Sequence, residues 1–425
     1  MKTVMQRKVA AEDIELGMYV ARLDRSWEDS PFLFQGFVVS TSEELEQLRS
    51  LCKFVFVDED LSEYEDRTLI RSVEVKPQGK VRATRTEMHK VTEEEHKLTF
   101  EREVIKAAKL RTKTRDYVSK LFEDVRLGFA VDTETAKAVV NDLVETITED
   151  ANTALWLTSL KNVHEYTAQH CINVSVLSIV FGKHLGFTED QLKLIGLGAL
   201  LHDVGKMNTP PEILNKPGKL TPDEFEVIKR HPVDGYETML GTGNVPDQSL
   251  QIIKYHHERL SGRGYPDGLK GDQISTAVLM VAIADVYDAM TSERVYHQGM
   301  PAHDALKALY QIAPGEFGKK LMEEFIRCIG VYPVGSVVEL FSGDIGIVMS
   351  VDPENKLRPL VMLVRDHDGC EYLPRRYVSL AAMSATDKSR DWTVRRIVNP
   401  VHLGLSMQQI AQEEIFSGSS ETFHI

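Results

Sequence analysis

Histidine is the residue type that best indicates the chemistry of this chain. Nine of its 14 histidines fall between His164 and His303, and several lie on apolar helical stripes rather than in polar loops. His170, for example, shares a predicted helix face with Val174 and Leu177. A buried imidazole is costly unless its nitrogens are satisfied, and neutral imidazole is the commonest nitrogen ligand of transition metals. The clustering therefore predicts a metal site.

Carboxylates accompany these histidines. Asp203 follows His202 directly after the apolar run 192–201, and Asp285 lies in a segment that is otherwise apolar on most sides. A carboxylate in such surroundings needs a cation. The candidate ligands are five imidazoles and two carboxylates: His170, His202, Asp203, His231, His256, His257 and Asp285. This set of nitrogen and oxygen ligands, without a thiolate, suits Fe, Mn, Zn or Co.

Two adjacent histidines indicate that more than one metal is bound. His256 and His257 follow an apolar helical stripe, and neighbouring residues on a helix point about 100° apart. One helix face cannot easily use both, so a helix end beside two metals suits them better. Taken singly, each histidine is more often a hydrogen-bonded core residue. The ordered set is what favours two divalent transition metals.

The order of these motifs resembles the HD superfamily of metal-dependent phosphohydrolases. Four stretches narrow the resemblance to the HD-GYP subfamily, bacterial phosphodiesterases for cyclic di-GMP: 199–206 (ALLHDVGK), 229–232 (KRHP), 256–269 (HHERLSGRGYPDGL) and 284–296 (ADVYDAMTSERVY). The resemblance covers about residues 128–330. The region ahead of it resembles an uncharacterised domain that is often found before HD-GYP domains.

The resemblance implies a role for each ligand. Asp203 would bridge two metals, one completed by His170, His202 and Asp285 and the other by His231, His256 and His257. The catalytic residues would be Asp203 and Lys206, with a metal-bridged hydroxide as the nucleophile. The substrate contacts would come from Lys206, Gly264, Tyr265, Pro266, Asp288 and Arg294. A surface lysine and a tight turn are the alternatives for Lys206 and for 264–266.

The sequence departs from the subfamily pattern at two points. Some members bind a third metal through a Glu four residues before the first histidine ligand, where this chain has Tyr166. Glu165 is adjacent, but a shift of one residue is a large rotation around a helix, so two metals are expected. His297 stands where members often have a basic residue, which predicts weaker recognition of the second guanine or phosphate.

The expected activity is hydrolysis of cyclic di-GMP to linear pGpG, and whether the reaction continues to GMP stays open. A phosphodiesterase for cyclic GMP-AMP is one alternative, since the metals act on phosphate and do not read the base. Another is a non-catalytic receptor for the dinucleotide that acts as a signalling module. The complete ligand set argues against the receptor. Diguanylate cyclases are a further expected partner, through the surface around 264–266.

The ligands must be positioned by helices, and the helical region is the core of the chain. The segment 163–185 is apolar nearly all round, which is typical of a central helix. A capping box at Thr221–Glu224, with Pro222 at the first helical position, predicts a helix that runs to His231. The fold class expected is therefore a mainly α-helical HD-type catalytic domain with small β-rich N-terminal and C-terminal modules.

Changes in composition predict the domain boundaries. Dense charge and sparse apolar residues at 73–127 fit a solvated connector or a helix that pairs in a homodimer. The divisions are a small β-rich domain at 1–72, with a short helix at 42–51; a charged helical linker at 73–127; the HD-GYP catalytic domain at 128–330; a small β module at 331–382, with strands at 337–349 and 360–364; and a C-terminal tail at 383–425.

Composition excludes several classes of partner. The 425 residues carry 50 Lys and Arg against 64 Asp and Glu, a formal charge of −14, which argues against a binder of nucleic acid polymers or anionic membranes. The longest apolar run, 277–284, is far shorter than the ~18 residues of a membrane span. The first residues do not resemble a signal peptide, and the four cysteines lie far apart. These features predict a cytoplasmic protein.

Overall fold

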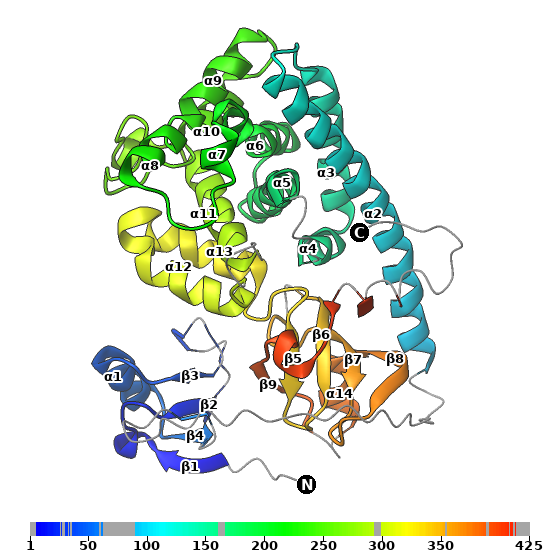
Figure 1. Cartoon of the computed structure of the whole chain (residues 1–425). Coiled ribbons are helices and arrows are strands. Elements are labelled where there is room, and N and C mark those ends of the chain that lie inside the picture. Colours follow the sequence, from blue (N-terminus) through cyan, green and yellow to red (C-terminus); the bar gives the residue numbers. More distant parts are fainter. Residues whose placement is uncertain are drawn as a thin grey trace. The chain divides into compact units, whose positions relative to one another are not determined.

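Two compact units make up the chain in the computed structural model (Figure 1). One is formed by residues 94–335 with 405–425, and the other by residues 1–93 with 336–404. The structure describes residues 6–62 except 26, 28, 29, 33, 35, 59 and 60; residues 90–159 and 166–292; residues 299–387 except 353 and 354; and residues 391–413 except 408, 411 and 412.

Helices form the first unit and one of them, α5, lies at its centre. α5 (Tyr166–His184) packs against α3, α4, α6, α11 and α13 (Figure 1). The other helices of this unit are α2 (Lys90–Arg126), α3 (Thr133–Glu149), α4 (Ala151–Ser159), α6 (Glu189–Leu201), η4 (Val204–Asn208), α7 (Pro211–Leu214), α8 (Pro222–Ile228), α9 (His231–Gly241), α10 (Asp247–Tyr255), η5 (Gly271–Gln273), α11 (Thr276–Thr291), α12 (Ala302–Glu316) and α13 (Lys319–Ile329).

The central position of α5 follows from its composition. From Cys171 to Phe181 every residue is buried, including Asn173, Ser175 and Ser178. A helix that is apolar nearly all round must be covered on every side to remove that surface from water. The prediction of a central helix at 163–185 is confirmed for the part from Tyr166 onwards.

The capping box at Thr221 is present, but the helix that it opens is shorter than expected. Glu224 N–H donates to Thr221 Oγ1 at 3.3 Å, and Thr221 N–H donates to Glu224 Oε2 at 2.8 Å. α8 ends at Ile228, and His231 is the first residue of α9 rather than the last of α8. Pro232 explains the new start, because proline fits the first turn of a helix and not its interior.

A close backbone contact joins η4 to α9. A β-carbon built on Gly205 would lie 2.0 Å from the carbonyl oxygen of His231 and 2.4 Å from the nitrogen of Gly235. Only glycine fits such an approach. Gly205 thereby brings the segment after Asp203 against the residue that begins α9.

We expect Gly205→Ala to destabilise the helical unit. The added methyl would push α9 away from η4, and overpacking of this kind typically costs about 1–3 kcal/mol. Thermal unfolding followed by circular dichroism would measure the loss. Gly241→Ala is the matched control, because a β-carbon at Gly241, the last residue of α9, meets nothing within 4 Å. Equal unfolding temperatures for the two variants would contradict this account.

Two antiparallel sheets form the second unit. The N-terminal sheet has the strand order β1-β4-β2-β3 and packs with the predicted helix α1 (Ser42–Leu51), and the C-terminal sheet has the order β8-β7-β6-β5-β9. The strands are β1 (Gln6–Ala10), β2 (Tyr19–Leu23), β3 (Phe37–Val38), β4 (Phe54–Asp58), β5 (Val337–Leu340), β6 (Ile345–Ser350), β7 (Leu360–Arg365), β8 (Glu371–Ser379) and β9 (Val394–Ile397), with η1 (Ala11–Asp13), α14 (Leu380–Thr386) and η6 (Pro400–Leu403) between or after them.

An ion pair connects these sheets across the length of the sequence. Arg395 on β9 binds the fully buried Asp58 at the end of β4, with Nε to Oδ2 at 3.0 Å, and it binds Glu339 on β5 at 2.8 Å. The sequence analysis treated the two β regions as separate modules and ended the second at residue 382. The contacts group them in one unit, and β9 continues the sheet beyond that residue.

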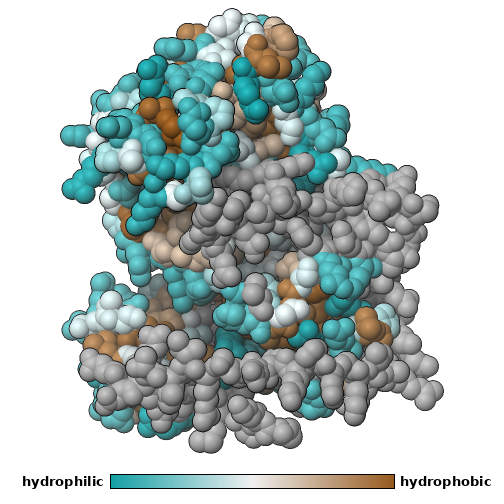
Figure 2. Space-filling view, in the orientation of Figure 1, coloured by the Kyte–Doolittle hydropathy of each residue, from teal (hydrophilic) through white to brown (hydrophobic). Residues whose placement is uncertain are grey.

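The fold class expected from the sequence, a mainly α-helical HD-type domain with small β-rich terminal regions, is confirmed. On the face shown in Figure 2, the helical unit is mostly hydrophilic with scattered hydrophobic residues. Among the described residues, no helix combines the length and the apolar character that crossing a bilayer requires.

Candidate metal centre

Seven side chains from five places in the helical unit converge on one buried centre. His170 comes from α5 and Asp285 from α11, whereas the others lie at helix ends. His202 caps α6 and is followed by Asp203; His231 begins α9; His256 caps α10 and is followed by His257. The ligand atoms fall into two triads, each with its atoms within 4.8 Å of one another: His170, His202 and Asp285, and His231, His256 and His257.

The first triad is almost completely buried. His170 Nε2 lies 3.0 Å from Asp285 Oδ1, and His202 Nε2 lies 3.9 Å from the same oxygen. The exposed fractions of the residues are 4%, 1% and 7% for His170, His202 and Asp285. Three donor atoms of nitrogen and oxygen type therefore meet in a site from which most water is excluded.

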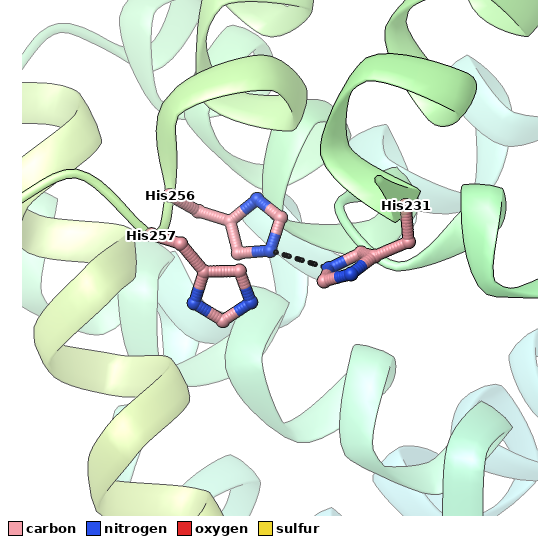
Figure 3. Close-up of side chains that lie close together, drawn as sticks. All are labelled: His231, His256 and His257. Atoms are coloured by element: carbon pink, nitrogen blue, oxygen red, sulfur yellow. Dashed lines mark hydrogen bonds between the residues drawn. The ribbon is translucent and has the colours of Figure 1, made fainter. Parts of the chain in front are cut away.

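The second triad consists of three imidazoles. Figure 3 shows the rings of His231, His256 and His257 pointing toward one another, with His231 Nε2 and His256 Nε2 3.2 Å apart. The ring centroids of His256 and His257 are 4.1 Å apart. Adjacent residues can share a centre here because α10 ends at Tyr255, so the backbone no longer imposes helical spacing on His257.

Asp203 lies between the triads, and each of its oxygens faces one of them. Its Oδ2 is 3.4 Å from His202 Nε2 and 3.8 Å from His170 Nε2. Its Oδ1 is 3.3 Å from His231 Nε2 and 4.0 Å from His256 Nε2. A carboxylate in this position can offer one oxygen to each triad.

Three of the histidines are held by backbone carbonyls. His202, His231 and His256 each donate from Nδ1 to the carbonyl oxygen three residues earlier, at 2.7, 2.7 and 2.9 Å. A carbonyl only accepts, so the proton of the neutral ring lies on Nδ1 and the lone pair of Nε2 is free for a metal. The orientation of these ligands is thus determined by their own helix ends.

The charges of the site favour ionised carboxylates. Burial raises the pKa of Asp203, but His202 and Lys206 outweigh it and hold the pKa well below its usual value. The pKa of Asp285 is also well below its usual value, because the hydrogen bond from His170 outweighs the effect of burial. Both carboxylates therefore carry negative charge into an interior that needs cations to balance it.

Two of the three rings of the second triad are held in the form that binds metals. Burial, followed by the neighbouring His257, lowers the pKa of His256 well below its usual value. Burial lowers the pKa of His257 to about 3. Both rings are therefore neutral at pH 7, and neutral imidazole is the form that ligates.

Two orphaned atoms show that these residues fit a metal. Among the described residues, His202 Nε2 and Asp203 Oδ1 are buried and make no hydrogen bond. Unsatisfied buried polar atoms are rare and costly in folded proteins. Their direction into the centre, together with the nitrogen and oxygen donor set, fits divalent transition metals.

Lys206 pairs with Asp203 in the structure. Its Nζ lies 2.5 Å from Asp203 Oδ2, and 23% of the side chain remains exposed. Burial lowers the pKa of Lys206, but Asp203 outweighs it and raises the pKa above its usual value. Lys206 is therefore a charged group at the edge of the centre.

The loop that contains Gly264, Tyr265 and Pro266 lies against the second triad. The ring centroid of Tyr265 is 4.7 Å from that of His257, with 31° between the planes. Glycine is required at 264, because a β-carbon there would lie 2.5 Å from the carbonyl oxygen of His257. The loop thus packs directly beside the second triad.

The structure places Asp288 behind His170 and leaves it only 1% exposed. His170 Nδ1 donates to Asp288 Oδ2 at 2.8 Å, and Asn173 and Ser292 also donate to this carboxylate. The sequence analysis expected Asp288 to contact substrate. Its side chain, one turn after Asp285 on α11, is instead buried against the ring of His170.

Two nearby residues were missed by the sequence analysis. Cys171 Sγ lies within 4.8 Å of ligand atoms of His202 and Asp203, but burial raises the pKa of its thiol and so disfavours the thiolate that binds metals. Glu258 is fully buried and accepts three backbone N–H groups of the loop after Pro266. The position of Glu258 directly after His256 and His257 is the feature of the sequence that could have indicated it.

Some expected residues lie outside the described part of the chain. These are Arg294 and His297, within 293–298, and Glu165, within 160–165. The side chain of Tyr166 is likewise not described. The predicted contacts of Arg294 and the argument against a third metal therefore stay predictions from the sequence.

Comparison with known proteins identifies the class of protein to which this chain belongs. The HD domain model matches residues 145–321, and a domain of unknown function (DUF3391) matches residues 6–136. A cyclic di-GMP phosphodiesterase of Pseudomonas aeruginosa is 34% identical over 391 residues, which cover 90% of this chain and 91% of that protein.

Two further relatives match the helical region. The cyclic di-GMP phosphodiesterase response regulator RpfG of Xanthomonas campestris is 42% identical over 146 residues, 34% of this chain and 39% of that protein. A 3'3'-cGAMP-specific phosphodiesterase of Vibrio cholerae is 35% identical over 178 residues, 41% of each chain.

The helical domain brings histidines and aspartates together, most of them at helix ends, and the HD model matches it. These features define an HD-domain phosphohydrolase. The chain belongs to the HD-GYP subfamily of this group, as its motifs predicted.

We expect Glu258→Gln to loosen the loop around Tyr265. The carboxylate accepts N–H groups of Asp267, Gly268 and Leu269 at 2.7, 2.9 and 3.0 Å, and an amide presents a donor in place of one acceptor. Losing a charged hydrogen bond costs about 1.5–3 kcal/mol, which corresponds to roughly 10- to 100-fold faster amide exchange.

Hydrogen exchange of the three amides, resolved by mass spectrometry, would measure the change. Glu237→Gln on the exposed face of α9 is the control and should leave their exchange unaltered. Unchanged protection in Glu258→Gln would show that the carboxylate does not hold the loop.

Proposed function

We propose that this protein is a metal-dependent phosphodiesterase that hydrolyses cyclic di-GMP to linear pGpG. The position of Asp203, with one oxygen toward each triad, carries this proposal. The names of the relatives support the substrate, because the one that aligns over 90% of this chain is a cyclic di-GMP phosphodiesterase. Whether hydrolysis continues to GMP is decided by a product assay.

We propose that two divalent transition metals occupy the centre. His170, His202 and Asp285 would hold one of them and His231, His256 and His257 the other, with Asp203 shared. Fe, Mn, Zn and Co all suit nitrogen and oxygen ligands, so elemental analysis must choose among them. The separate triads support the number two, since three side chains and one oxygen of Asp203 would complete each site.

The residues of the chain have distinct parts in this reaction. When bound, a pair of metals activates water for attack on the phosphodiester and polarises its oxygen. Asp203 holds the two triads at a fixed position relative to each other. The ammonium group of Lys206 stabilises the negative charge that develops on the phosphate. Tyr265 provides an aromatic surface beside His257 for the dinucleotide. The surrounding helices exclude water from the buried ligands.

A phosphodiesterase for cyclic GMP-AMP is the second candidate. One relative of 35% identity over 178 residues is specific for 3'3'-cGAMP. The ligands act on phosphate and do not contact a base, so the triads are compatible with either substrate. Parallel product assays with the two dinucleotides would choose between them.

A non-catalytic receptor fits the centre less well. Every ligand position expected from the HD motifs is filled, and the buried carboxylates need cations. Association with diguanylate cyclases around 264–266, formation of a homodimer and a cytoplasmic location stay predictions of the sequence.

We expect Asp203→Asn to lose metal and activity together. The amide is nearly isosteric but removes the charge that both triads share, so less metal should be bound than the two equivalents expected for the wild type. Turnover of cyclic di-GMP should fall by more than ~100-fold, since even outer ligand partners typically contribute 10- to 100-fold. Elemental analysis, a product assay and circular dichroism on one preparation would test this.

Asp190→Asn is the control for that variant, because the Asp190 side chain is 97% exposed on α6. It should bind metal and turn over like the wild type. A folded Asp203→Asn protein with near-normal hydrolysis would refute the shared carboxylate, and three metals in the active wild type would refute the number two.

We expect Arg294→Ala to weaken catalysis without loss of metal. The guanidinium fork suits two hydrogen bonds to phosphate or guanine. Removing charged hydrogen bonds should lower kcat/KM for cyclic di-GMP by about 10- to 100-fold. Steady-state kinetics with elemental analysis would test this, and a variant that purifies without its metals would show a structural role instead.

A further inference from the structure

A small cavity lies between the helices α2, α3, α4 and α5. Its volume is about 20 Å³, and its lining includes Arg111 of α2 and Asn173 of α5. The other lining groups are mostly apolar, with Thr146 and Thr158 among them. A cavity of this size is large enough for one water molecule. Arg111 and Asn173 are not ligands of the proposed centre.

Asn173 connects this cavity to the carboxylate behind His170. It lies one turn after His170 on α5 and is 1% exposed. Its Nδ2 donates to Asp288 Oδ1 at 3.0 Å, while its Oδ1 is buried without a hydrogen bond to the described residues. The amide thus uses its donor on Asp288 and leaves its acceptor available to a donor on the cavity side.

Asp288 in turn holds His170 from the side opposite the centre. His170 Nδ1 donates to Asp288 Oδ2 at 2.8 Å, and His170 Nε2 faces Asp285 at 3.0 Å. Asp285 and Asp288 lie one turn apart on α11, so this helix contacts both nitrogens of the ring. Ser292 Oγ adds a hydrogen bond to Asp288 at 3.1 Å.

Arg111 supplies a positive charge on the far side of this network. Burial lowers the pKa of its guanidinium to about 10, and the negative charge of Asp288 acts in the opposite direction. The group therefore stays charged at pH 7. A buried carboxylate such as Asp288 needs such a countercharge, because an isolated charge in the interior is costly.

We propose that Arg111 and Asn173 are positioning residues for the metal centre: Arg111 supplies the countercharge and Asn173 the hydrogen bond that hold Asp288 against His170. The inference rests on the proposed metal centre and extends it to α2. His170 differs from the other histidines in the partner of its Nδ1. This nitrogen donates to the Asp288 side chain, whereas Nδ1 of His202, His231 and His256 donates to a backbone carbonyl. Of the two histidines in the first triad, His170 is therefore the one whose Nδ1 is held by a side chain distant in sequence.

The test is the affinity of the full-length, metal-free protein for Co²⁺, followed by the visible absorption of the bound ion. Asp288→Asn should weaken one of the two Co²⁺ sites by about 10- to 100-fold, as loss of an outer partner of a histidine ligand does. Arg111→Met should weaken the same site by about 2- to 30-fold, the usual range for residues that act through a network.

Controls separate positioning from general stability. Lys113→Met removes a charge from the same helix, but the Lys113 side chain is 63% exposed and pairs with Asp142, so Co²⁺ affinity should not change. Arg111→Lys keeps the charge and should recover most of the lost affinity. Asn173→Ala replaces Arg111→Met if that variant does not fold, and the same site should weaken.

A double-mutant cycle tests whether Arg111 acts on the metal site through Asp288. If Arg111 acts through Asp288, Arg111→Met should change Co²⁺ affinity less than ~2-fold in the Asp288→Asn background. Wild-type affinity in folded Arg111→Met, an equal loss in both backgrounds, or the same loss in Lys113→Met would overturn the inference. Failure of the wild type to bind Co²⁺ would instead refute the proposed metal centre.

Discussion

The buried charge of Asp203 is the constraint on which the helical unit depends. The residue is 1% exposed, and a carboxylate in such an interior is stable only beside positive charge and hydrogen-bond donors. Lys206 provides one partner at 2.5 Å, and the histidine nitrogens of both triads lie around its two oxygens. α6 must therefore end where it does, and η4 must pack closely on α9 through Gly205.

Helix ends account for much of the geometry around that carboxylate. Where α6 and α10 end, and where α9 begins, a histidine can turn toward the centre while its Nδ1 bonds a carbonyl three residues earlier. The backbone itself thus selects the tautomer, without help from distant residues. His170 differs because it lies within α5, where the backbone carbonyls accept hydrogen bonds of the helix itself. The carboxylate of Asp288 on α11 therefore accepts the hydrogen bond from His170 Nδ1 instead.

The sequence predicted the ligands better than it predicted their support. All seven expected ligands converge, because polar groups on apolar stripes must meet partners inside the core. The assignment of Asp288 to substrate came from its motif alone, and only the packing of α11 on α5 shows it behind His170. The end of α8 and the start of α9 were also misplaced, since a capping box defines where a helix begins and not where it ends.

The sequence by itself determined the helical class, the set of candidate ligands and the subfamily, because residue types, apolar periodicity and motif order are local properties of the chain. Only the tertiary structure decided which long-range partners complete them. β9 carries two consecutive arginines and has no clear strand pattern, but it pairs with β5 while Arg395 reaches Asp58, 337 residues away. Arg111 reaches the cavity behind His170 for the same reason. Such contacts depend on how elements pack, and no local pattern encodes them.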